Sequence, residues 1–299
     1  MRLSQVASAD ELEIVRDGEF RTLGFLSDPQ AGMLTFVESP RYLAAVARGA
    51  PAAVLTTPAL RSALVEALVG GGEDDTGLAI CAEPRRAFFR LHNRLAAGGF
   101  YWDDFPTAID PTARIHPSAI VAARNVRIGA RTVVEPRVVI AERSIVGADC
   151  VLRAGAVLGS VGFQVLRLDG AVIDMTHGGG VELEDEVHVL ANAVVAAAVF
   201  RQSTRIGCGS RIGNLAFVSH NVQIGRRCLI GHNAVVNGNV RIGDEAWIGP
   251  GAALAHCITI GERAKVSLGS AVIGDVAAGE QVTGNVAIAH RRFLRHLAR

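Results

Sequence analysis

His220, Gly238 and His256 are evenly spaced along the chain, with the glycine midway between the two histidines. An imidazole titrates near neutral pH, so His220 could act as a general base. A glycine presents its backbone N–H with no side chain in the way, and Gly238 could therefore stabilise the oxyanion of a tetrahedral intermediate. The spacing alone also fits solvated histidines at the edge of a fold, because nine histidines are spread through the chain. Joint chemistry requires an element that stacks residues at this spacing.

A repeat of six residues in the second half of the chain predicts such an element. Twelve aliphatic residues recur at this spacing: Ile206, Ile212, Val218, Ile224, Ile230, Val236, Ile242, Ile248, Leu254, Ile260, Val266 and Val272. A small residue usually follows each of them. A helix repeats every 3.6 residues and a strand every two, so a period of six indicates the hexapeptide repeat of a parallel β-helix. Three units make one triangular coil, and one coil separates His220 from Gly238 and Gly238 from His256, which places all three in one column.

The repeat begins near residue 106 and is interrupted. Its earlier aliphatic members fall into three series with shifted phases: Ile109, Ile115 and Val121; Ile128, Val134, Ile140, Val146, Leu152 and Leu158; Leu183, Val189 and Val195. Residues 159–181 lack the repeat and read as loop, strand, turn and strand, with turn chemistry at Leu168-Asp169-Gly170. They predict a hairpin excursion, either a carrier of binding groups or a decoration. Its return at His177-Gly178-Gly179-Gly180 predicts a flexible loop that could bring His177 near a substrate.

The first 105 residues predict a separate small α/β domain. Short apolar runs predict buried strands and runs with an early proline predict helices: 34–37, 52–56 and 78–81 for strands; 40–48, 58–69 and 84–97 for helices. The fold class is therefore mainly β, with an α/β domain at 1–105, a β-helix at 106–285 with its excursion at 159–181, and a short basic C-terminal helix at 286–299.

Bulk composition favours a soluble, cytoplasmic enzyme. The formal net charge of +1 does not indicate a nucleic-acid surface, and no apolar run approaches the roughly 20 residues of a membrane span. No signal peptide is recognisable at the N-terminus. Five cysteines are scattered singly, which indicates reduced thiols, and Cys228 and Cys257 are interpreted as packing residues.

Three segments resemble the UDP-3-O-acylglucosamine N-acyltransferases of lipid A (lipopolysaccharide) biosynthesis. Residues 214–221, NLAFVSHN, resemble the NLVQIAHN motif of that family. Residues 34–42, LTFVESPRY, resemble its LSFLxNPKY, and residues 159–163, GSVGF, resemble its GSDGFG at the start of the same excursion. The similarity runs in the same order along nearly the whole chain. The chain therefore resembles a member, or a divergent paralogue, of this hexapeptide-repeat acyltransferase family.

The resemblance implies a left-handed β-helix, an exception to the usual right-handed crossover, and a homotrimer with active sites between neighbouring prisms. It makes His220 the catalytic base and Gly238 the oxyanion donor. It also implies that Phe36 and Tyr42 sandwich a uracil ring, with Ser39 beside it in place of the family's asparagine. Asn214 and Asn221 are further matches to the motif.

The implied activity is transfer of a 3-hydroxyacyl group to the amine of a UDP-linked glucosamine derivative. The donor would be a phosphopantetheine thioester, carried by acyl carrier protein or by coenzyme A, with no permanently bound cofactor and no metal. A basic C-terminal tail at 286–299 suits either an acidic carrier protein or the phosphates of coenzyme A.

Several positions depart from the family pattern. Gly213 and Val161 stand where the family has aspartates, which would remove any carboxylate that tunes His220 from position 213. Ala196 and Ala197 replace an Asp-Arg pair. His256 lies one residue before Cys257, the position that aligns with the family's second active-site histidine. The family's longer C-terminal helical extension, associated with acyl carrier protein, is largely missing.

Three alternatives remain open at this point. One is a short-chain acyl- or acetyl-CoA-dependent N-acyltransferase of sugar nucleotides for surface polysaccharide, favoured by Ser39 and the shortened C-terminus. Another is a non-catalytic trimeric scaffold. A third is a zinc enzyme of the γ-carbonic anhydrase type, which needs three converging histidines; His220 and His256 are two coils apart, roughly 9–10 Å, and His232 lies on another side.

Overall fold

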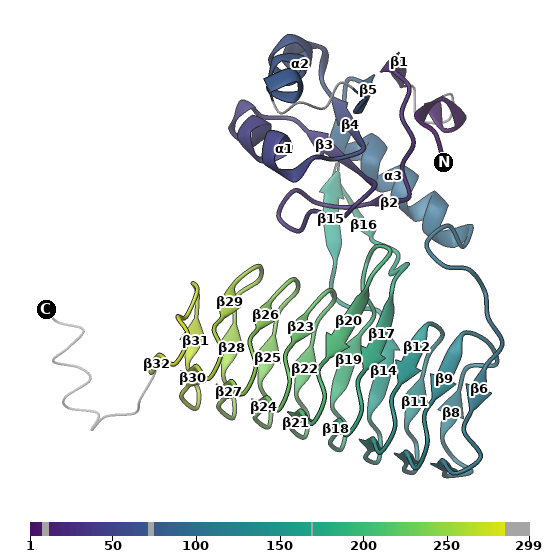
Figure 1. Cartoon of the computed structure of the whole chain (residues 1–299), viewed down its shortest axis with the longest axis vertical. Helices are drawn as coiled ribbons and strands as arrows, with labels where there is room; N and C mark the ends of the chain where they lie inside the picture. The colour runs from purple at the N-terminus through teal and green to yellow at the C-terminus, as the bar shows by residue number, and fades with distance from the viewer. Residues whose placement is uncertain (8–11, 71–74, 169, 285–299) are drawn as a thin grey trace, which may run out of the picture. The chain divides into compact units, whose positions relative to one another are not determined.

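The computed structural model describes residues 1–7, 12–70, 75–168 and 170–284. It divides into two compact units (Figure 1). The first unit comprises Met1–Asp104, Val161–Gly179 and Ala198–Gln202, and the second comprises Phe105–Ser160, Gly180–Ala197 and Ser203–Arg299. The basic helix expected over 286–299 lies outside the described residues. Within the described residues, no helix combines the length and apolar character that a membrane span needs.

A five-stranded sheet forms the centre of the first unit, in the order β1 (Glu13–Arg16), β5 (Gly77–Ile80), β4 (Ala53–Thr56), β3 (Met33–Val37) and β2 (Thr22–Leu23). All neighbours are parallel except β1, which pairs antiparallel with β5. The strands predicted at 34–37, 52–56 and 78–81 are confirmed as β3, β4 and β5. Strands β1 and β2 escaped prediction because neither carries an apolar run, and β2 is very short.

Short helices surround and connect the strands of this sheet, and three of the helical segments begin with a proline. The helices that precede and connect the strands are η1 (Leu3–Gln5), η3 (Pro40–Tyr42), α1 (Leu43–Gly49), η4 (Pro58–Leu60), α2 (Arg61–Gly70) and α3 (Pro84–Ala97). Proline suits the first turn because its missing N–H would have no helical partner there. The three helices predicted from the sequence are confirmed, each entered at its proline.

Two segments that leave the β-helix complete the core of the first unit. The excursion forms an antiparallel hairpin of β15 (Val165–Leu168) and β16 (Ala171–Asp174), as predicted, although Asp169 of the predicted turn lies outside the described residues. Met175, Val199 and Phe200 are buried in the same apolar cluster as Phe88 of α3. These segments are therefore structural parts of the first unit.

The second unit is a prism of three parallel sheets. The β24 sheet contains β7 (Arg114–Ile115), β10 (Val133–Val134), β13 (Val151–Leu152), β18 (His188–Val189), β21 (Arg211–Ile212), β24 (Leu229–Ile230), β27 (Trp247–Ile248), β30 (Lys265–Val266) and β32 (Gln281–Val282). The β22 sheet contains β8 (Ile120–Val121), β11 (Val139–Ile140), β14 (Val157–Ser160), β19 (Val194–Ala196), β22 (Phe217–Val218), β25 (Val235–Val236), β28 (Ala253–Leu254) and β31 (Ala271–Val272). The β23 sheet contains β6 (Ala108–Ile109), β9 (Val126–Ile128), β12 (Ser144–Val146), β17 (Gly180–Leu183), β20 (Ser203–Ile206), β23 (Gln223–Ile224), β26 (Arg241–Ile242) and β29 (Thr259–Ile260). The predicted left-handed parallel β-helix of hexapeptide repeats is confirmed.

The repeated aliphatic residues fill the interior of the prism. Val218, Val236 and Leu254 pair in register on three successive coils, and all three are fully buried. The phase shift near residue 121 reflects one extra residue in that coil, because Ile109 pairs with Ile128 and not with Arg127. Extra residues are thus accommodated at corners, and the interior column continues unbroken through the irregular part of the sequence.

The corners explain the small residue after each aliphatic one. A Cβ on Gly231 would come within 2.4 Å of the backbone nitrogen of Pro250 on the next coil, so no side chain fits there. Other corner positions adopt left-handed backbone, among them Asn221, Asn239 and Cys257 with φ values of 59°, 62° and 60°. Asparagine tolerates this conformation better than most residues do. Cys257 is exposed, so its interpretation as a packing residue is wrong, whereas Cys228 is buried as expected.

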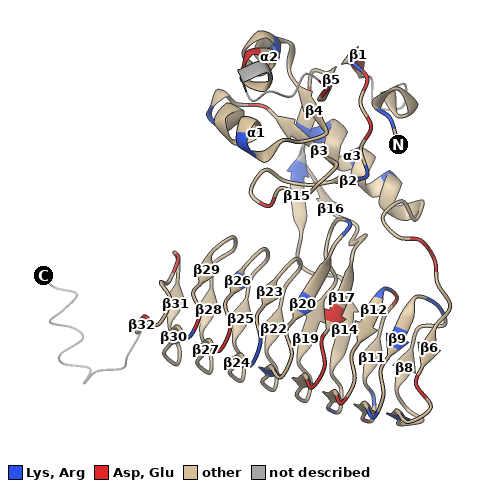
Figure 2. Ribbon diagram, in the orientation of Figure 1, with Lys and Arg blue, Asp and Glu red and all other residues tan. Residues whose placement is uncertain are grey.

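Both acidic and basic residues lie along one edge of the β-helix (Figure 2). Arg131 and Asp149 approach to 2.5 Å, as do Arg227 and Glu245, each pair joining neighbouring coils at corners between the β23 and β24 sheets. These side chains are well exposed, and such surface pairs contribute little to stability. Burial of the interior aliphatic column is therefore the main stabilising term of this unit.

Candidate active site

One corner of the prism carries the predicted catalytic residues. Residues 219–222 connect β22 to β23, and the same corner of the next two coils carries residues 237–240 and 255–258. His220, Gly238 and His256 each stand two residues after an interior aliphatic residue, so the strand registers bring them into one column. The chain also leaves the prism for the first unit at this corner, after Ser160 and again after Ala197.

The imidazole of His220 lies against the backbone of Gly238. A Cβ added to Gly238 would be 2.3 Å from Nε2 of His220, 2.7 Å from Cε1 and 2.9 Å from Cδ2, so the Nε2 end of the ring faces this glycine. His220 is 5% exposed. The Gly238 carbonyl accepts a hydrogen bond from the Cys257 N–H, and among the residues that the structure describes the Gly238 N–H has no hydrogen-bond partner. An imidazole and an unused N–H donor therefore stand side by side.

The residues on both sides of His220 hold it in place. Ser219 Oγ lies 3.2 Å from Nδ1 of His220, and both side chains are buried. The carbonyl of His220 accepts a hydrogen bond of 3.0 Å from the Asn239 N–H. The Asn221 N–H donates to Thr204 Oγ1 at 3.0 Å, and Asn221 Nδ2 donates to Asn239 Oδ1 at the same distance. Residues of three coils thus hold the His220 corner in place.

Asn214 and Gly213, the other end of the motif, lie at a different corner. The Asn214 N–H donates to Nδ1 of His232 at 2.9 Å, and its carbonyl accepts from the Asn233 N–H at 3.0 Å. Strand β22 separates this corner from His220 by roughly 10 Å at the usual rise per residue. Within one prism, a carboxylate at position 213 would therefore not reach His220. A Cβ on Gly213 would also come within 2.6 Å of the next coil's backbone.

His256 lies on the far side of Gly238 from His220. It is exposed, and two strand spacings separate the two histidines, roughly 9–10 Å. A group bound at the Gly238 N–H would lie between the two histidines. His256 therefore stays a candidate for a second active-site residue. Within the described part of the chain, no three His, Cys, Asp or Glu side chains form a group that could hold a metal ion.

Ala196 and Ala197 occupy closely packed positions at the corner where the chain leaves the prism. Both are buried, and the Ala197 N–H donates to the carbonyl of Ser160 at 2.9 Å. Charged side chains at these positions would need more room than this corner provides here. Val161 is 73% exposed, so a carboxylate would be tolerated there.

The predicted uracil-binding residues belong to the first unit. Phe36, on β3, is partly buried against Phe88 of α3, with ring centroids 5.0 Å apart. Tyr42 ends η3 and is 39% exposed. The Arg41 guanidinium lies 4.6 Å from the centre of the Tyr42 ring and donates to its hydroxyl at 2.8 Å. Ser39 precedes η3 in extended conformation, and its side chain makes no cap hydrogen bond.

His177 is buried and hydrogen-bonded within the excursion. It is 9% exposed, its Nε2 accepts from the Gly162 N–H at 3.1 Å, and its Nδ1 lies 3.2 Å from the Met175 carbonyl oxygen. Burial lowers the pKa of His177. Its hydrogen bonds within the excursion use both ring nitrogens, so the structure assigns it a structural contact, and its predicted place near a substrate stays a prediction.

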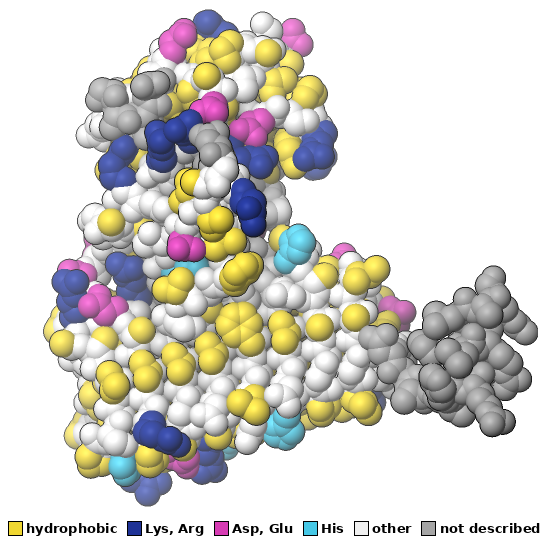
Figure 3. Space-filling view, turned by 180° about the vertical axis from the view of Figure 1, so that it is seen from behind, with side chains coloured by type: hydrophobic (Ala, Val, Ile, Leu, Met, Phe, Trp, Pro, Cys, Tyr) yellow, Lys and Arg dark blue, Asp and Glu magenta, His cyan; other side chains and the backbone are white. Residues whose placement is uncertain are grey.

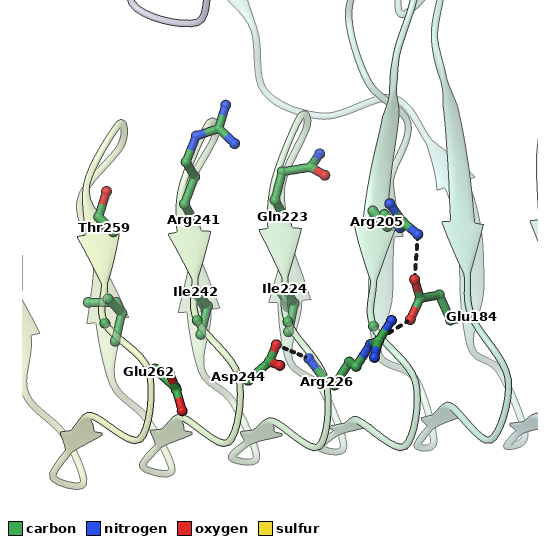
Figure 4. Close-up of a pocket in the computed structure, with 15 residues that line it drawn as sticks. Glu184, Arg205, Gln223, Ile224, Arg226, Arg241, Ile242, Asp244, Thr259 and Glu262 are labelled. Atoms are coloured by element: carbon green, nitrogen blue, oxygen red, sulfur yellow. Dashed lines mark hydrogen bonds and ion pairs between the residues drawn. The ribbon is translucent and has the colours of Figure 1, made fainter. Parts of the chain in front are cut away.

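A groove of about 570 Å³ runs over the β23 sheet (Figure 4). One row of outward side chains crosses it, with one member from each successive coil: Arg205, Gln223, Arg241 and Thr259. Glu184 accepts a hydrogen bond from Arg205 and lies 3.9 Å from Arg226. The lining includes three arginines and three carboxylates, so its charge is balanced. The groove adjoins the His220 corner, since Gln223 directly follows it.

Comparison with known proteins identifies the repeat. Residues 125–160 and 203–238 match the bacterial transferase hexapeptide family (six repeats), and residues 221–256 match the hexapeptide repeat of succinyl-transferase. These segments of the chain therefore contain hexapeptide repeats.

Two curated relatives carry the same name. A UDP-3-O-acylglucosamine N-acyltransferase of Paracidovorax citrulli is 32% identical over 67% of the chain and 60% of the relative. The enzyme of the same name from Herminiimonas arsenicoxydans is 28% identical over 71% of the chain and 67% of the relative. The chain thus spans less than two thirds of the first relative's length. These matches confirm the resemblance found in the sequence.

A solved structure with similar repeats is the UDP-N-acetylglucosamine acyltransferase of Francisella novicida. It is 18% identical, the match covers 63% of this chain and 73% of that chain, and the TM-score is 0.46.

Sequence reasoning did not single out Ser219 and Thr204. Ser219 is visible in the sequence only as a departure from the alanine of NLVQIAHN. Thr204 lies in the preceding coil and outside the motif, so only the coil geometry could have connected it to the His220 corner.

Proposed function

We propose that this chain is an acyltransferase that moves an acyl group from a thioester to the amine of a UDP-linked glucosamine derivative. The observation that carries this proposal is the contact between the His220 imidazole and Gly238, with the unused Gly238 N–H beside the ring. A base and an oxyanion donor in van der Waals contact suit acyl transfer, because both act on the same tetrahedral intermediate.

In the proposed reaction, Nε2 of His220 removes a proton from the amine as its nitrogen attacks the thioester carbonyl carbon. The carbonyl oxygen becomes an oxyanion and receives a hydrogen bond from the Gly238 N–H. The intermediate then collapses, the C–S bond breaks, and the proton held by His220 passes to the departing thiolate. A positioned base supplies roughly 10²–10⁴-fold of rate and one oxyanion donor roughly 10²–10³-fold.

The proposal assigns nucleotide recognition to Phe36, Ser39 and Tyr42. Phe36 and Tyr42 flank the short segment that contains Ser39, whose side chain makes no cap hydrogen bond to η3. A flat uracil gains dispersion energy between two aromatic rings. Since Arg41 covers a face of the Tyr42 ring, a base that stacks on that face replaces a cation–π contact.

We further propose a homotrimer with active sites between prisms. The outward positions of the β22 sheet are all apolar: Ile120, Val139, Val157, Val194, Phe217, Val235, Ala253 and Ala271. Figure 3 shows a line of hydrophobic side chains crossing the β-helix. Continuous exposed apolar surface of this kind is typical of protein interfaces. A phosphopantetheine arm would then lie in the groove between two prisms, on acyl carrier protein or coenzyme A, both cytoplasmic donors.

A second candidate is a short-chain or acetyl-CoA-dependent N-acyltransferase of another sugar nucleotide, as for surface polysaccharide. The buried Ala196 and Ala197, where the related motif has charged residues, favour this candidate, because they change the corner next to the proposed acyl site.

The test is acyl transfer by the purified protein to a UDP-linked amino sugar, with 3-hydroxyacyl-carrier protein and acetyl-CoA as parallel donors. We expect turnover with the carrier-protein donor and a loss of about 10²–10⁴-fold in His220→Ala. His116→Ala, at an exposed corner of another coil, is the matched control and should retain full activity.

Turnover with acetyl-CoA alone would select the second candidate. Binding of UDP without turnover from either donor would favour a non-catalytic trimeric scaffold. Full activity of His220→Ala would contradict the proposed mechanism.

A further inference from the structure

The hydroxyl of Ser219 is a hydrogen-bond partner of the His220 ring at Nδ1. Ser219 Oγ lies 3.2 Å from Nδ1, and the two side chains are 4% and 5% exposed. Ser219 stands where the related motif NLVQIAHN has alanine, so this contact is a property of the present chain.

We propose that Ser219 is a positioning residue that sets the tautomer of His220. Its oxygen accepts a hydrogen bond from Nδ1–H and thereby leaves the lone pair on Nε2, the nitrogen that faces Gly238. This inference rests on the proposed acyl transfer for its purpose, although the tautomer itself can be measured without turnover.

The geometry requires this direction of the hydrogen bond if His220 is the base. A neutral imidazole carries one proton, so its two nitrogens cannot both accept. The nitrogen that removes the substrate proton must lie near the oxyanion donor, and Nε2 is the atom against Gly238. Nδ1 must then hold the proton and needs an acceptor. Histidine in water prefers the opposite tautomer, with the proton on Nε2, so the site has to impose the useful one.

A carboxylate from position 213 does not provide this acceptor. Residue 213 is glycine, and its corner lies at the far end of β22 from His220 in the same prism. The neutral hydroxyl of Ser219 supplies an acceptor directly beside the ring. It also stabilises the imidazolium that forms when His220 takes the amine proton, because a hydrogen bond to a charged donor is stronger than one between neutral groups.

The use of Ser219 differs from that of other corner serines. Ser144 Oγ donates to the Ala141 carbonyl at 2.7 Å and Ser210 Oγ donates to the Gly225 carbonyl at 2.8 Å, so these hydroxyls stabilise the corners themselves. Ser210 is also fully buried. Ser210→Ala therefore deletes an equivalent buried hydroxyl at a corner that carries no part of the proposed site, and it serves as the matched control.

The experiment is ¹⁵N NMR of selectively ¹⁵N-histidine-labelled protein, with His220→Gln to identify the His220 signals. The chemical shifts of the two ring nitrogens report which one carries the proton. We expect Nδ1–H in the native protein and in Ser210→Ala, and a shift toward Nε2–H in Ser219→Ala. Ser219→Ala should fold, because the related motif carries alanine at this position. An unchanged tautomer in Ser219→Ala, or Nε2–H in the native protein, would overturn the inference.

Kinetics gives a second readout. Ser219→Ala should lower kcat/KM roughly 3- to 10-fold, as expected for loss of one hydrogen bond. The acid limb of its pH profile should move to lower pH, since His220 loses a group that stabilises its protonated form. A uniform loss of activity with an unmoved acid limb would indicate a merely structural serine. If the tautomer changes as expected but the native protein transfers no acyl group, the proposed function fails while the role of Ser219 in setting the tautomer stands.

Discussion

Glycine is needed at position 238 because the His220 ring occupies the space that a side chain there would fill. The atoms nearest to a Cβ at this position all belong to the imidazole, at 2.3 to 2.9 Å. Real Cβ atoms do not approach other heavy atoms this closely, so any side chain would displace the ring. The same glycine supplies the unused N–H. One residue therefore serves both the placement of the base and the proposed oxyanion contact.

Gly238→Ala should abolish most acyl transfer while leaving nucleotide binding intact. A displacement of about 1 Å at a reacting group costs on the order of 10²-fold in rate. The check is kcat together with UDP affinity by calorimetry. Gly274→Ala is the control, because Gly274 stands two residues after β31, away from His220, and nothing lies within 4 Å of its added Cβ. Equal activity of the two variants would show that His220 tolerates displacement.

The even spacing of His220, Gly238 and His256 was sufficient to predict their column, because a coil of constant length makes sequence distance a spatial distance. The same reasoning does not extend to side-chain partners. The Ser219 hydroxyl reaches the His220 ring through its side-chain rotamer. Thr204 reaches Asn221 from β20, which directly follows a segment that lies outside the prism. Position 213 shows the opposite error. The motif suggests that residue 213 lies close to His220, but strand β22 separates the two residues.

At the scale of elements, helix α3 is joined to the excursion by a buried histidine. His92 is fully buried, its Nδ1 lies 2.8 Å from the Tyr101 hydroxyl, and its Nε2 lies 2.8 Å from the Thr176 carbonyl oxygen. A carbonyl can only accept, so Nε2 carries the proton and Nδ1 accepts from Tyr101. Neighbouring Asn93 donates to the Asp174 carbonyl and accepts from the Thr176 N–H, each at 2.9 Å. The ring is therefore used as a neutral group.

The stability of the first unit should fall when the pH drops below about 6.5. Burial lowers the pKa of His92 to about 4, whereas the unfolded chain keeps the ordinary value of 6.5. The unfolded state therefore binds more protons between these values, and stability that is complete above pH 6.5 is lost as the pH falls toward 4. At 1.36 kcal/mol per pKa unit, the loss is about 3 kcal/mol. His177 adds to it, since burial lowers its pKa as well.

Denaturant unfolding at pH 7.5, 6 and 5 tests this, with tryptophan fluorescence as the probe. The chain has two tryptophans, and Trp247→Phe leaves only Trp102, which packs on the core of the first unit. In this background, His92→Leu should be less stable at pH 7.5 but should lose less stability on acidification. His116→Ala, with an exposed ring, should retain the native pH dependence. The same slope with and without His92 would refute the assignment.

The sequence predicted this connection only in part. The loss of the six-residue repeat located the hairpin of β15 and β16, because the repeat stops where the chain leaves the prism. It could not show where the departing segments pack, since Met175 and Phe200 enter a core built mostly from residues far earlier in the chain. The buried state of His92 and His177 depends on those non-local contacts, and the glycines after His177 suggested flexibility instead.

The whole molecule presents one apolar row among otherwise polar or mixed surfaces of its prism. The β23 sheet turns Arg205, Gln223 and Arg241 outward, whereas the β22 sheet turns only apolar residues outward. The interior aliphatic residues alone explain the six-residue repeat. The apolar character of the outward row on the β22 sheet therefore needs a separate explanation. An interface with further copies of the chain provides that reason, and it would also place a second prism beside the His220 corner, which borders the β22 sheet.

Val235→Lys should therefore dissociate the assembly and abolish acyl transfer without unfolding the prism. Val235 points outward from β25 and its neighbour Val236 fills the interior, so a charge at 235 is compatible with a folded coil but not with an apolar interface. Light scattering should give the mass of three chains for the native protein and the mass of one chain, 31.4 kDa, for the variant. Gln223→Lys adds the same charge to the polar β23 sheet of the adjoining coil and should remain trimeric.

A native protein with the mass of a single chain, or a Val235→Lys variant that keeps the native mass and activity, would mean that the apolar row serves something other than self-assembly. The active site would then have to be complete within one prism.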